Sequence, residues 1–361
     1  MINAFGHVFE MERGSDGSGK ILEREAPALG DGHVLCRIDT FALTANNATY
    51  ALFGEAMGYY DFFPAAGAES VIVPVWGYAT ITQSNVLELS PGQQVYGFLP
   101  FADTAVLEPH KISDIGFSDG AAHRSALHPF YNALSFADGD PFSTKNKHLV
   151  PALRPLFSTA WLLEDFFADA DFYAADQIIL TSASSKTALG TAFCLKQAGR
   201  FKGRVIALTS SKNASFVEAT GLYDETVTYE AIETIDKTKT IVIDFAGNAA
   251  VLHAVHRHVS PDIAYSCQVG KSHAGSAPGQ ASLPEPTPIL FFAPDQAKAA
   301  AKRLGTAGFQ QALFARWEGY SDAADSWFTV ETINGLEDAA DIFRRFMSGD
   351  VDGSNVYVVT P

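Results

Sequence analysis

The sequence predicts an α/β protein in which a parallel sheet, covered by helices on both faces, is joined to a strand-rich region. Two observations carry this prediction. After residue 150, short and almost wholly apolar strands alternate with helical segments, which is typical of a parallel sheet buried between helices. Before residue 110, short strands are separated by glycine and proline turns, which is typical of a small β-barrel or sandwich.

The strand-rich region covers residues 31–108. Three strands are expected there, Val34–Asp39, Ser70–Ile81 and Gln94–Leu99, and turn signals precede the first and the third. Pro74 and Gly77 interrupt the second of these, so we expect an edge, a bulge or a bend at that strand.

The alternating region supplies the predicted parallel sheet. Its strands are Gln177–Thr181, Val205–Leu208 and Thr240–Asp244, and its helices are Ser158–Phe167, Lys186–Gln197, Phe216–Thr220 and Ala249–His258. Farther on, we expect helices at Gln296–Leu304 and Leu336–Phe346 and a strand at Asn355–Val359. Two polar stretches, residues 138–147 and 272–288, are predicted to be loops near the domain junctions.

Charge and composition exclude several classes of partner. The formal net charge is −16, which opposes binding to nucleic acid and to anionic membrane surfaces. No apolar run approaches the roughly 18–20 residues that span a bilayer. The N-terminal residues lack a basic stretch followed by an apolar run, so we expect no signal peptide and a cytoplasmic protein. The three cysteines are far apart, which favours neither a disulfide framework nor a cysteine zinc site.

The segment from Ile178 to Gly190 is the most informative motif. A buried strand runs into a polar turn and then a helix, which places backbone N–H groups and a helix dipole at the carboxyl end of the strand. This pattern predicts a Rossmann-type phosphate site. The candidate residues are Ser182, Ser184, Ser185, Lys186 and Thr187. Alternatively, the hydroxyls only cap the helix.

The residues after the second strand indicate which dinucleotide would bind. An NAD site carries an acidic residue here to hold the ribose hydroxyls, and none is present. Small hydroxyls and a lysine suit the 2′-phosphate of NADP instead: Thr209, Ser210, Ser211 and Lys212. The alternative is a solvated loop with a surface lysine.

The strand–turn–helix motif resembles that of the medium-chain dehydrogenase/reductase superfamily, in particular its zinc-independent, quinone oxidoreductase-like branch. That branch has the turn A-x-x-G-x-x-G, and its glycines fall on Ser185 and Ala188 here. Serine and alanine leave less room for a pyrophosphate than glycine does. Hydroxyls and Lys186 would then replace part of the missing backbone contact.

Four further segments resemble the cofactor cleft of that superfamily: Leu156–Ala160, Asp244–Asn248, Cys267–Gly270 and Leu290–Phe292. The resemblance implies that one or more residues of each contact the cofactor, namely Thr159, Phe245, Gly247, Val269 and Phe291. Alternatively, Ser158 or Thr159 is only a helix N-cap, and the last two segments are ordinary buried strands.

Phe41–Gly54 resembles the catalytic domain of the same branch. This segment has no cysteine, and Gly67–Ala68–Glu69 stands where zinc-dependent members have Gly-His-Glu, so we expect no metal at the reaction centre. Without a Lewis acid, an enolate oxygen needs hydrogen-bond donors. The candidates are Tyr50, which matches the motif tyrosine, and Asn46, Asn47, Tyr60 and Tyr131. Any of them can instead be a structural polar group.

The resemblance implies a Rossmann-type doubly wound parallel sheet at residues 151–294 and a GroES-like β-barrel catalytic domain at 1–150 and 295–361. It implies an NADP(H)-dependent reductase, often a homodimer, acting on a conjugated enone, a quinone or a similar small apolar carbonyl compound. The alternative is a non-catalytic protein that binds a nucleotide or a lipid-like ligand. His253, His256 and His258 are interpreted as exposed helix histidines rather than as metal ligands.

Overall fold

The computed structural model describes residues 5–25, 29–270 and 283–361. The chain divides into two compact units. Unit 1 comprises Met1–Arg154, Phe328–Val351 and Asn355–Pro361, and unit 2 comprises Pro155–Trp327 and Asp352–Ser354. Residues 295–327, which the sequence analysis assigns to the catalytic domain, therefore lie in unit 2.

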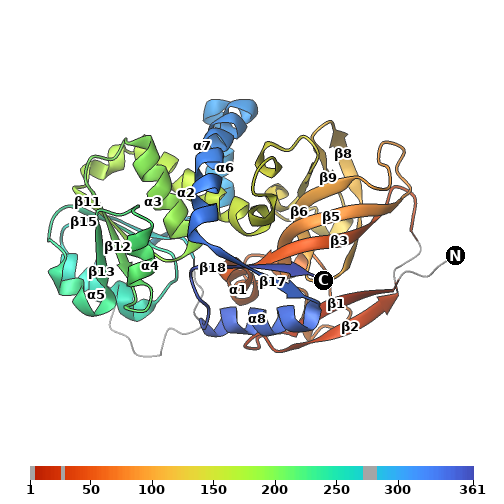
Figure 1. Ribbon diagram of the computed structural model, residues 1–361, viewed down its shortest axis with the longest axis horizontal. Helices are drawn as coiled ribbons and strands as arrows, with labels where there is room; N and C mark the ends of the chain where they lie inside the picture. Colours follow the sequence, from red (N-terminus) through yellow and green to blue (C-terminus); the bar gives the residue numbers. More distant parts are fainter. Residues whose placement is uncertain (1–4, 26–28, 271–282) are drawn as a thin grey trace. The chain divides into compact units, whose positions relative to one another are not determined.

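Unit 2 is built on a six-stranded parallel sheet (Figure 1). The strands are β11 (Gln177–Thr181), β12 (Arg204–Thr209), β13 (Glu225–Thr228), β14 (Thr240–Asp244), β15 (Ile263–Gln268) and β16 (Ile289–Leu290). Their order is β13-β12-β11-β14-β15-β16. Numbered within the unit, this is 3-2-1-4-5-6, the doubly wound order. Its switch point lies at the carboxyl ends of β11 and β14.

Alternating side chains make both faces of this sheet apolar. Ile206 and Leu208 of β12 belong to one buried cluster with residues of helix α5 (Ala249–Val259). Ala207, between them in sequence, belongs to a second cluster with Val217 of α4 (Ala214–Ala219). The two helices thus cover opposite faces of the sheet, as expected for strands that read as unbroken apolar runs.

Four more helices belong wholly or partly to unit 2: α2 (Val150–Asp169), α3 (Lys186–Ala198), α6 (Ala293–Leu304) and α7 (Thr306–Trp327). Gly190 allows α3 to approach α2 closely, because a Cβ at Gly190 would lie 2.9 Å from the Cβ of Ala160. Phe157 of α2 stacks on Tyr320 of α7, with ring centroids 4.6 Å apart.

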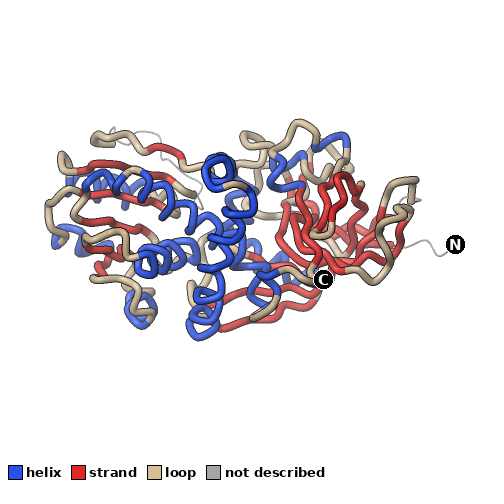
Figure 2. The backbone as a smooth tube through the Cα atoms, turned by 90° about the horizontal axis from the view of Figure 1, so that it is seen from above, coloured by secondary structure: helices blue, strands red, loops and turns tan. Residues whose placement is uncertain are grey.

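Unit 1 contains a nine-stranded mixed sheet in the order β17-β18-β3-β5-β6-β10-β9-β8, with β7 paired to β3. Its strands are β3 (Val34–Leu43), β5 (Pro74–Ser84), β6 (Gln94–Pro100), β7 (Thr104–Leu107), β8 (Pro109–Ser113), β9 (Gly116–Asp119), β10 (Ala133–Phe136), β17 (Thr329–Asn334) and β18 (Asn355–Thr360). A three-stranded sheet contains β2 (Gly19–Glu25), β1 (Phe5–Glu12) and β4 (Ser70–Val71), and the unit also contains the α-helices α1 (Ala45–Leu52) and α8 (Leu336–Ser348). Figure 2 distinguishes these strands from the helices.

The strand β5 is an inner strand, so the expectation of an edge there is wrong. Pro74 is its first residue, a position that proline tolerates. Gly77 is needed because a Cβ there would lie 2.3 Å from the Thr40 carbonyl oxygen. The expected irregularity lies in the β3–β5 pairing, whose register shifts twice.

Most predicted elements are confirmed, and the strands at 177–181 and 240–244 have the predicted bounds. Helix α2 begins at Val150, so Thr159 lies inside it and the N-cap interpretation of Ser158 or Thr159 is wrong. The sequence pattern did not predict the strands and helices β1, β2, β7, β8, β9, β10, β13, β17, α1 and α7. The predicted loop at 138–147 contains the short 3-10 helix Pro141–Ser143, and most of 272–288 lies outside the described residues.

Candidate functional site

The turn after β11 begins with a residue in the left-handed region of backbone conformation. Ser182 has a φ of +49°, and its Oγ lies 3.3 Å from the hydroxyl of Tyr229. Ser185 is the N-cap of α3, because its Oγ accepts a hydrogen bond from the Ala188 amide at 3.3 Å. Ser185 therefore has the capping role that the sequence left open as an alternative.

The other hydroxyl residues of the turn also have local roles. The Oγ of Ser184 accepts a hydrogen bond from the Asn213 side-chain amide at 3.0 Å. Thr187 lies in the first turn of α3, where its backbone carbonyl oxygen, not its hydroxyl, accepts a hydrogen bond from the Thr191 hydroxyl at 2.8 Å. The turn is thus held from within unit 2, by side chains that follow it in sequence.

Lys186 is the first residue of α3, and its side chain is half-buried. Its Nζ donates to the carbonyl oxygen of Gly353 at 3.4 Å. Burial lowers the pKa of Lys186 to about 8, and the charge of Asp352 opposes that shift. A Cβ at Gly353 would lie 3.2 Å from both the Cβ and the carbonyl oxygen of Ser184. The segment 352–354 therefore packs directly against the predicted phosphate turn.

The carboxyl end of β12 combines a buried hydroxyl with exposed polar residues. Thr209 is 1% exposed, and its Oγ1 has no hydrogen-bond partner among the described residues. Ser210 is half-buried, whereas Ser211 and Lys212 are exposed. The hydroxyl of Ser211 donates to the Glu230 carboxylate at 2.9 Å. An acidic group is thus present here after all, but it comes from the segment after β13 and not from the end of β12.

The third strand end is organised by Asp244, which is 2% exposed. Its carboxylate accepts hydrogen bonds from the Thr181 hydroxyl at 2.6 Å and from the amide of Gly247 at 3.0 Å. Its carbonyl oxygen accepts from the Val269 amide at 2.8 Å. Phe245 is buried directly after it. Asp244 therefore ties together the carboxyl ends of β11, β14 and β15.

The two remaining predicted cofactor residues differ in position: Thr159 lies on α2, whereas Phe291 lies at the carboxyl ends of β15 and β16, where its amide donates to the Gln268 carbonyl oxygen at 2.8 Å. The Thr159 hydroxyl donates to the Pro155 carbonyl oxygen of its own helix at 3.2 Å. Phe291 is buried after β16, and its ring centroid lies 5.7 Å from that of Phe166. The structure thus assembles the predicted residues of β11, β12, β14 and β15 at one edge of the sheet, whereas Thr159 is held by its helix.

In unit 1, helix α1 begins with a reciprocal capping box. The side chain of Thr44 accepts from the Asn46 amide at 3.3 Å, and the Asn47 side-chain oxygen accepts from the Thr44 amide at 2.8 Å. The Asn47 side-chain amide donates to the Pro74 carbonyl oxygen at 2.9 Å. Asn47 therefore anchors α1 to β5, and both ends of its side chain are used for that purpose.

Tyr50 lies one turn farther along α1 and is 4% exposed. Its hydroxyl oxygen accepts hydrogen bonds from the Trp76 indole at 3.1 Å and from the Asn46 side-chain amide at 3.4 Å. Burial raises the pKa of Tyr50, so its hydroxyl stays protonated at neutral pH. Trp76 was not among the predicted site residues, although a buried indole N–H needs an acceptor.

The other two predicted tyrosines, Tyr131 and Tyr60, differ in their contacts. Tyr131 contacts Tyr50 through Tyr59, which was not predicted as a site residue. The ring of Tyr59 lies 4.6 Å from that of Tyr50, and its hydroxyl lies 3.1 Å from the hydroxyl of Tyr131. Tyr50, Tyr59 and Tyr131 therefore form one buried group, which we call the tyrosine cluster. Tyr60 is outside it, because its hydroxyl donates to the Ala51 carbonyl oxygen.

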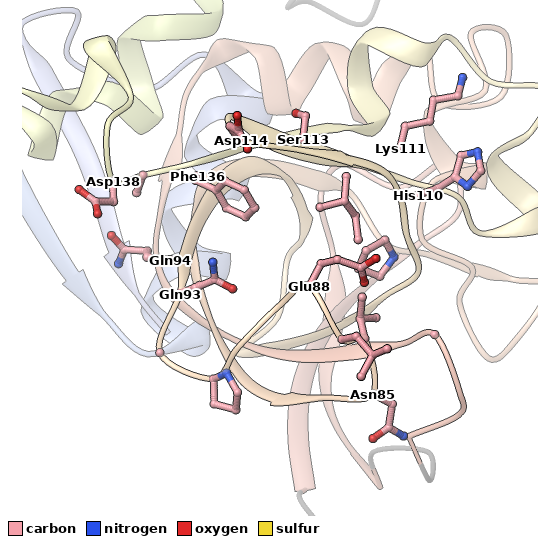
Figure 3. Close-up of a pocket in the computed structure, with 18 of the residues that line it drawn as sticks. Asn85, Glu88, Gln93, Gln94, His110, Lys111, Ser113, Asp114, Phe136 and Asp138 are labelled. Atoms are coloured by element: carbon pink, nitrogen blue, oxygen red, sulfur yellow. The ribbon is translucent and has the colours of Figure 1, made fainter.

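Two pockets open in unit 1, and none of the predicted site residues lines either one. The first has a volume of about 1390 Å³ and a polar lining that includes Glu88, His110 and Lys111 (Figure 3). The second, of about 670 Å³, is lined by Phe62, Phe63 and other apolar residues and by the ion-paired Asp119 and Arg124.

None of the three histidines of α5 is exposed. His256 has no exposed surface, and its ring nitrogens lie 2.8 Å from the Ser266 hydroxyl and 2.9 Å from the Pro284 carbonyl oxygen. The expectation of exposed histidines is wrong, because His253 and His258 are half-buried and His256, which joins α5 to β15, is fully buried. In the described part of the chain, no group of three or more His, Cys, Asp or Glu side chains is placed to hold a metal ion. Nor does any described helix have the length and apolar character needed to cross a membrane.

Several solved structures share this fold. CurA from Vibrio vulnificus in complex with NADPH is 15% identical, with 99% of each chain covered and a TM-score of 0.60. Mycobacterial Rv1454c complexed with NADPH is 14% identical (99% of this chain, 100% of that chain, TM-score 0.56). The quinone oxidoreductase from Coxiella burnetii is 13% identical (99% and 100%, TM-score 0.53). The protein therefore has the fold of the medium-chain dehydrogenase/reductase-type enzymes, as the sequence resemblance implied.

Within that fold class, the chain belongs to the family described as protein of unknown function (DUF2855), whose model matches residues 41–352. The matched range includes the tyrosine cluster, the turn after β11 and Asp352. The family is thus defined over the candidate residues of both units. No curated protein matches the sequence.

Proposed function

We propose that the protein is a zinc-independent, NADP(H)-dependent oxidoreductase that reduces a conjugated enone, a quinone or a similar small apolar carbonyl compound. The observation that carries the proposal is the doubly wound sheet of unit 2 with Lys186 and Lys212 after β11 and β12. In this proposal unit 2 holds the nucleotide. The nine-stranded sheet of unit 1 forms a GroES-like barrel that carries the catalytic residues.

The residues after β12 fit an adenosine 2′-phosphate in their chemistry. Thr209 offers a buried hydroxyl that has no hydrogen-bond partner among the described residues, and Lys212 offers an exposed positive charge. Lys186, at the N-terminal end of α3, suits the pyrophosphate. The names of solved structures with this fold support the same cofactor, because two of them are complexes with NADPH.

The dinucleotide, when bound, supplies the hydride. The chain's own task is then to stabilise negative charge on the substrate oxygen. The Tyr50 hydroxyl accepts two hydrogen bonds, from Trp76 and Asn46, which fix its orientation. These bonds leave the hydroxyl proton able to bind an enolate oxygen, and the raised pKa of Tyr50 keeps that proton in place. We therefore assign Tyr50 as the oxyanion donor.

Replacing Lys212 with alanine tests the nucleotide site. We expect wild-type protein to bind NADPH more tightly than NADH, and Lys212→Ala to weaken NADPH binding roughly tenfold while leaving NADH binding unchanged, because only NADPH carries the 2′-phosphate. Fluorescence titration measures both affinities. Lys202→Ala is the matched control, since Lys202 is also exposed but precedes β12. Equal losses for the two dinucleotides would contradict the assignment.

A second candidate is a non-catalytic ligand-binding protein. It is favoured by the glycine-poor turn, whose Ser184 is covered by Gly353. One assay distinguishes the reductase from the binding protein. In it, NADPH absorbance is followed during incubation with a panel of enones and quinones. Substrate-dependent oxidation supports the reductase. Saturable NADPH binding without oxidation of NADPH by any member of the panel supports the binding protein.

The edge of the parallel sheet predicts how a homodimer would form. In the described part of the chain, β16 ends the sheet, and its Ile289 and Leu290 are 55% and 58% exposed. An exposed apolar edge strand favours pairing with a second copy. We expect Leu290→Lys to convert a dimer to a monomer in light scattering. Leu87→Lys, which changes an exposed leucine of unit 1, should leave the mass unchanged. A dimer that survives Leu290→Lys would exclude this edge.

A further inference from the structure

The segment Asp352–Ser354 covers the turn to which the proposed function assigns a pyrophosphate. The Gly353 carbonyl oxygen accepts a hydrogen bond from Lys186 Nζ at 3.4 Å, and the backbone of Gly353 packs against Ser184. Ser184 and Lys186, the two residues that Gly353 contacts, flank the start of α3, where backbone N–H groups and the helix dipole attract anions. A phosphate that reached Lys186 would meet this segment first.

The same segment brings a negative charge to the site. The Asp352 carboxylate accepts hydrogen bonds from the amide and the hydroxyl of Ser354, at 2.9 Å and 2.6 Å. These bonds lower the pKa of Asp352, and the charges of Lys212 and Lys186 lower it further. Asp352 thus interacts with both lysines that the proposed function assigns to phosphate groups. Its carboxylate is held in one orientation by Ser354.

We propose that Asp352–Ser354 is an internal competitor for the nucleotide phosphates, which must displace it to reach Lys186. The proposal rests on the proposed function and adds to it the residues that set the affinity of the site. A carboxylate and a phosphate beside the same two lysines repel each other, so binding exchanges one anion for another. The affinity for NADPH is therefore lower than the two lysines alone would give.

Removing the carboxylate tests the competition. We expect Asp352→Asn to bind NADPH roughly two- to fivefold more tightly than wild type, which is the range for charge pairs near a surface. Fluorescence titration at low ionic strength measures this change, and added salt should reduce it because exposed charges are screened. Asp350→Asn is the matched control. It removes the same charge from an exposed residue just before the segment, and we expect no change in affinity.

Hydrogen exchange on wild-type protein gives a readout that does not depend on the variants. With saturating NADPH, amides of residues 352–354 should exchange faster and those of residues 183–188 more slowly. Increased protection of 352–354 would overturn the proposal, because the segment would then be a clamp on the nucleotide. Equal NADPH affinity of wild type and Asp352→Asn would also overturn it, with the proposed function intact. If neither protein binds NADPH, the proposed function fails and the competitor proposal fails with it.

Discussion

Replacing Asp119 with alanine is expected to lower the free energy of unfolding by about 3–5 kcal/mol, the typical cost of leaving a buried charge uncompensated. The side chains of Asp119 and Arg124 are 1% and 2% exposed, and Oδ2 lies 3.1 Å from Nη1. The Asp119 carboxylate also accepts a hydrogen bond from the Ala121 amide at 3.1 Å. Without this carboxylate, the guanidinium of Arg124 stays buried beside Phe63, over whose ring it lies. Urea unfolding followed by circular dichroism measures the change.

Two variants distinguish the effect of a buried, uncompensated charge on stability from the effect of losing an ion pair. Asp341→Ala breaks the exposed pair with Arg344, and it should cost less than about 1 kcal/mol. The double variant Asp119→Ala with Arg124→Met removes both charges, and it should recover much of the unfolding free energy that Asp119→Ala loses. If Asp119→Ala lowers the free energy of unfolding no more than Asp341→Ala does, burial does not determine how much the pair of Asp119 and Arg124 contributes to stability.

Replacing Tyr50 with phenylalanine should reduce kcat/KM for the best enone or quinone roughly 10²–10³-fold, the usual effect of losing an oxyanion donor. The affinity for NADPH should not change, because the substitution removes only a hydroxyl in unit 1. The change also leaves the Trp76 indole without its acceptor, so circular dichroism must show that the variant is folded. Steady-state kinetics at saturating NADPH measures the effect.

Tyr60→Phe is the matched control for this substitution. It removes the same atom from the same helix–loop region, but the Tyr60 hydroxyl donates to the Ala51 carbonyl oxygen and is outside the tyrosine cluster. We expect a change of no more than a few-fold in kcat/KM. Equal losses from Tyr50→Phe and Tyr60→Phe would indicate a structural effect and remove Tyr50 as the oxyanion donor.

The parallel sheet could be predicted closely because strands covered on both faces are short, unbroken apolar runs. The bounds of β11 and β14 follow from this pattern. Helix α7 was not predicted, although its buried residues Leu313, Trp317 and Tyr320 recur at helical spacing on one face. The start of α2 was missed because Pro155 lies inside the helix, where proline normally indicates an end.

The site was predicted only as far as local sequence determines it. The turn after β11 and its lysine follow from a strand–turn–helix pattern, which is a local feature. The contacts that decide its chemistry are not local: Gly353 against Ser184, and Glu230 beside Ser211. Pairs so far apart in sequence leave no periodic signal, so a single sequence cannot place an internal competitor or a second acidic group at the site.

The position of β18 has a consequence for how the chain folds during synthesis. This strand lies between β17 and β3, parallel to the first and antiparallel to the second. On the ribosome, β3 emerges before unit 2, but β18 emerges only after unit 2 has been made. The doubly wound sheet can therefore form while Phe41–Leu43 of β3 still lack their partner strand, since β7 pairs only with Val34–Arg37, and this short open edge is exposed to pairing with the wrong strand.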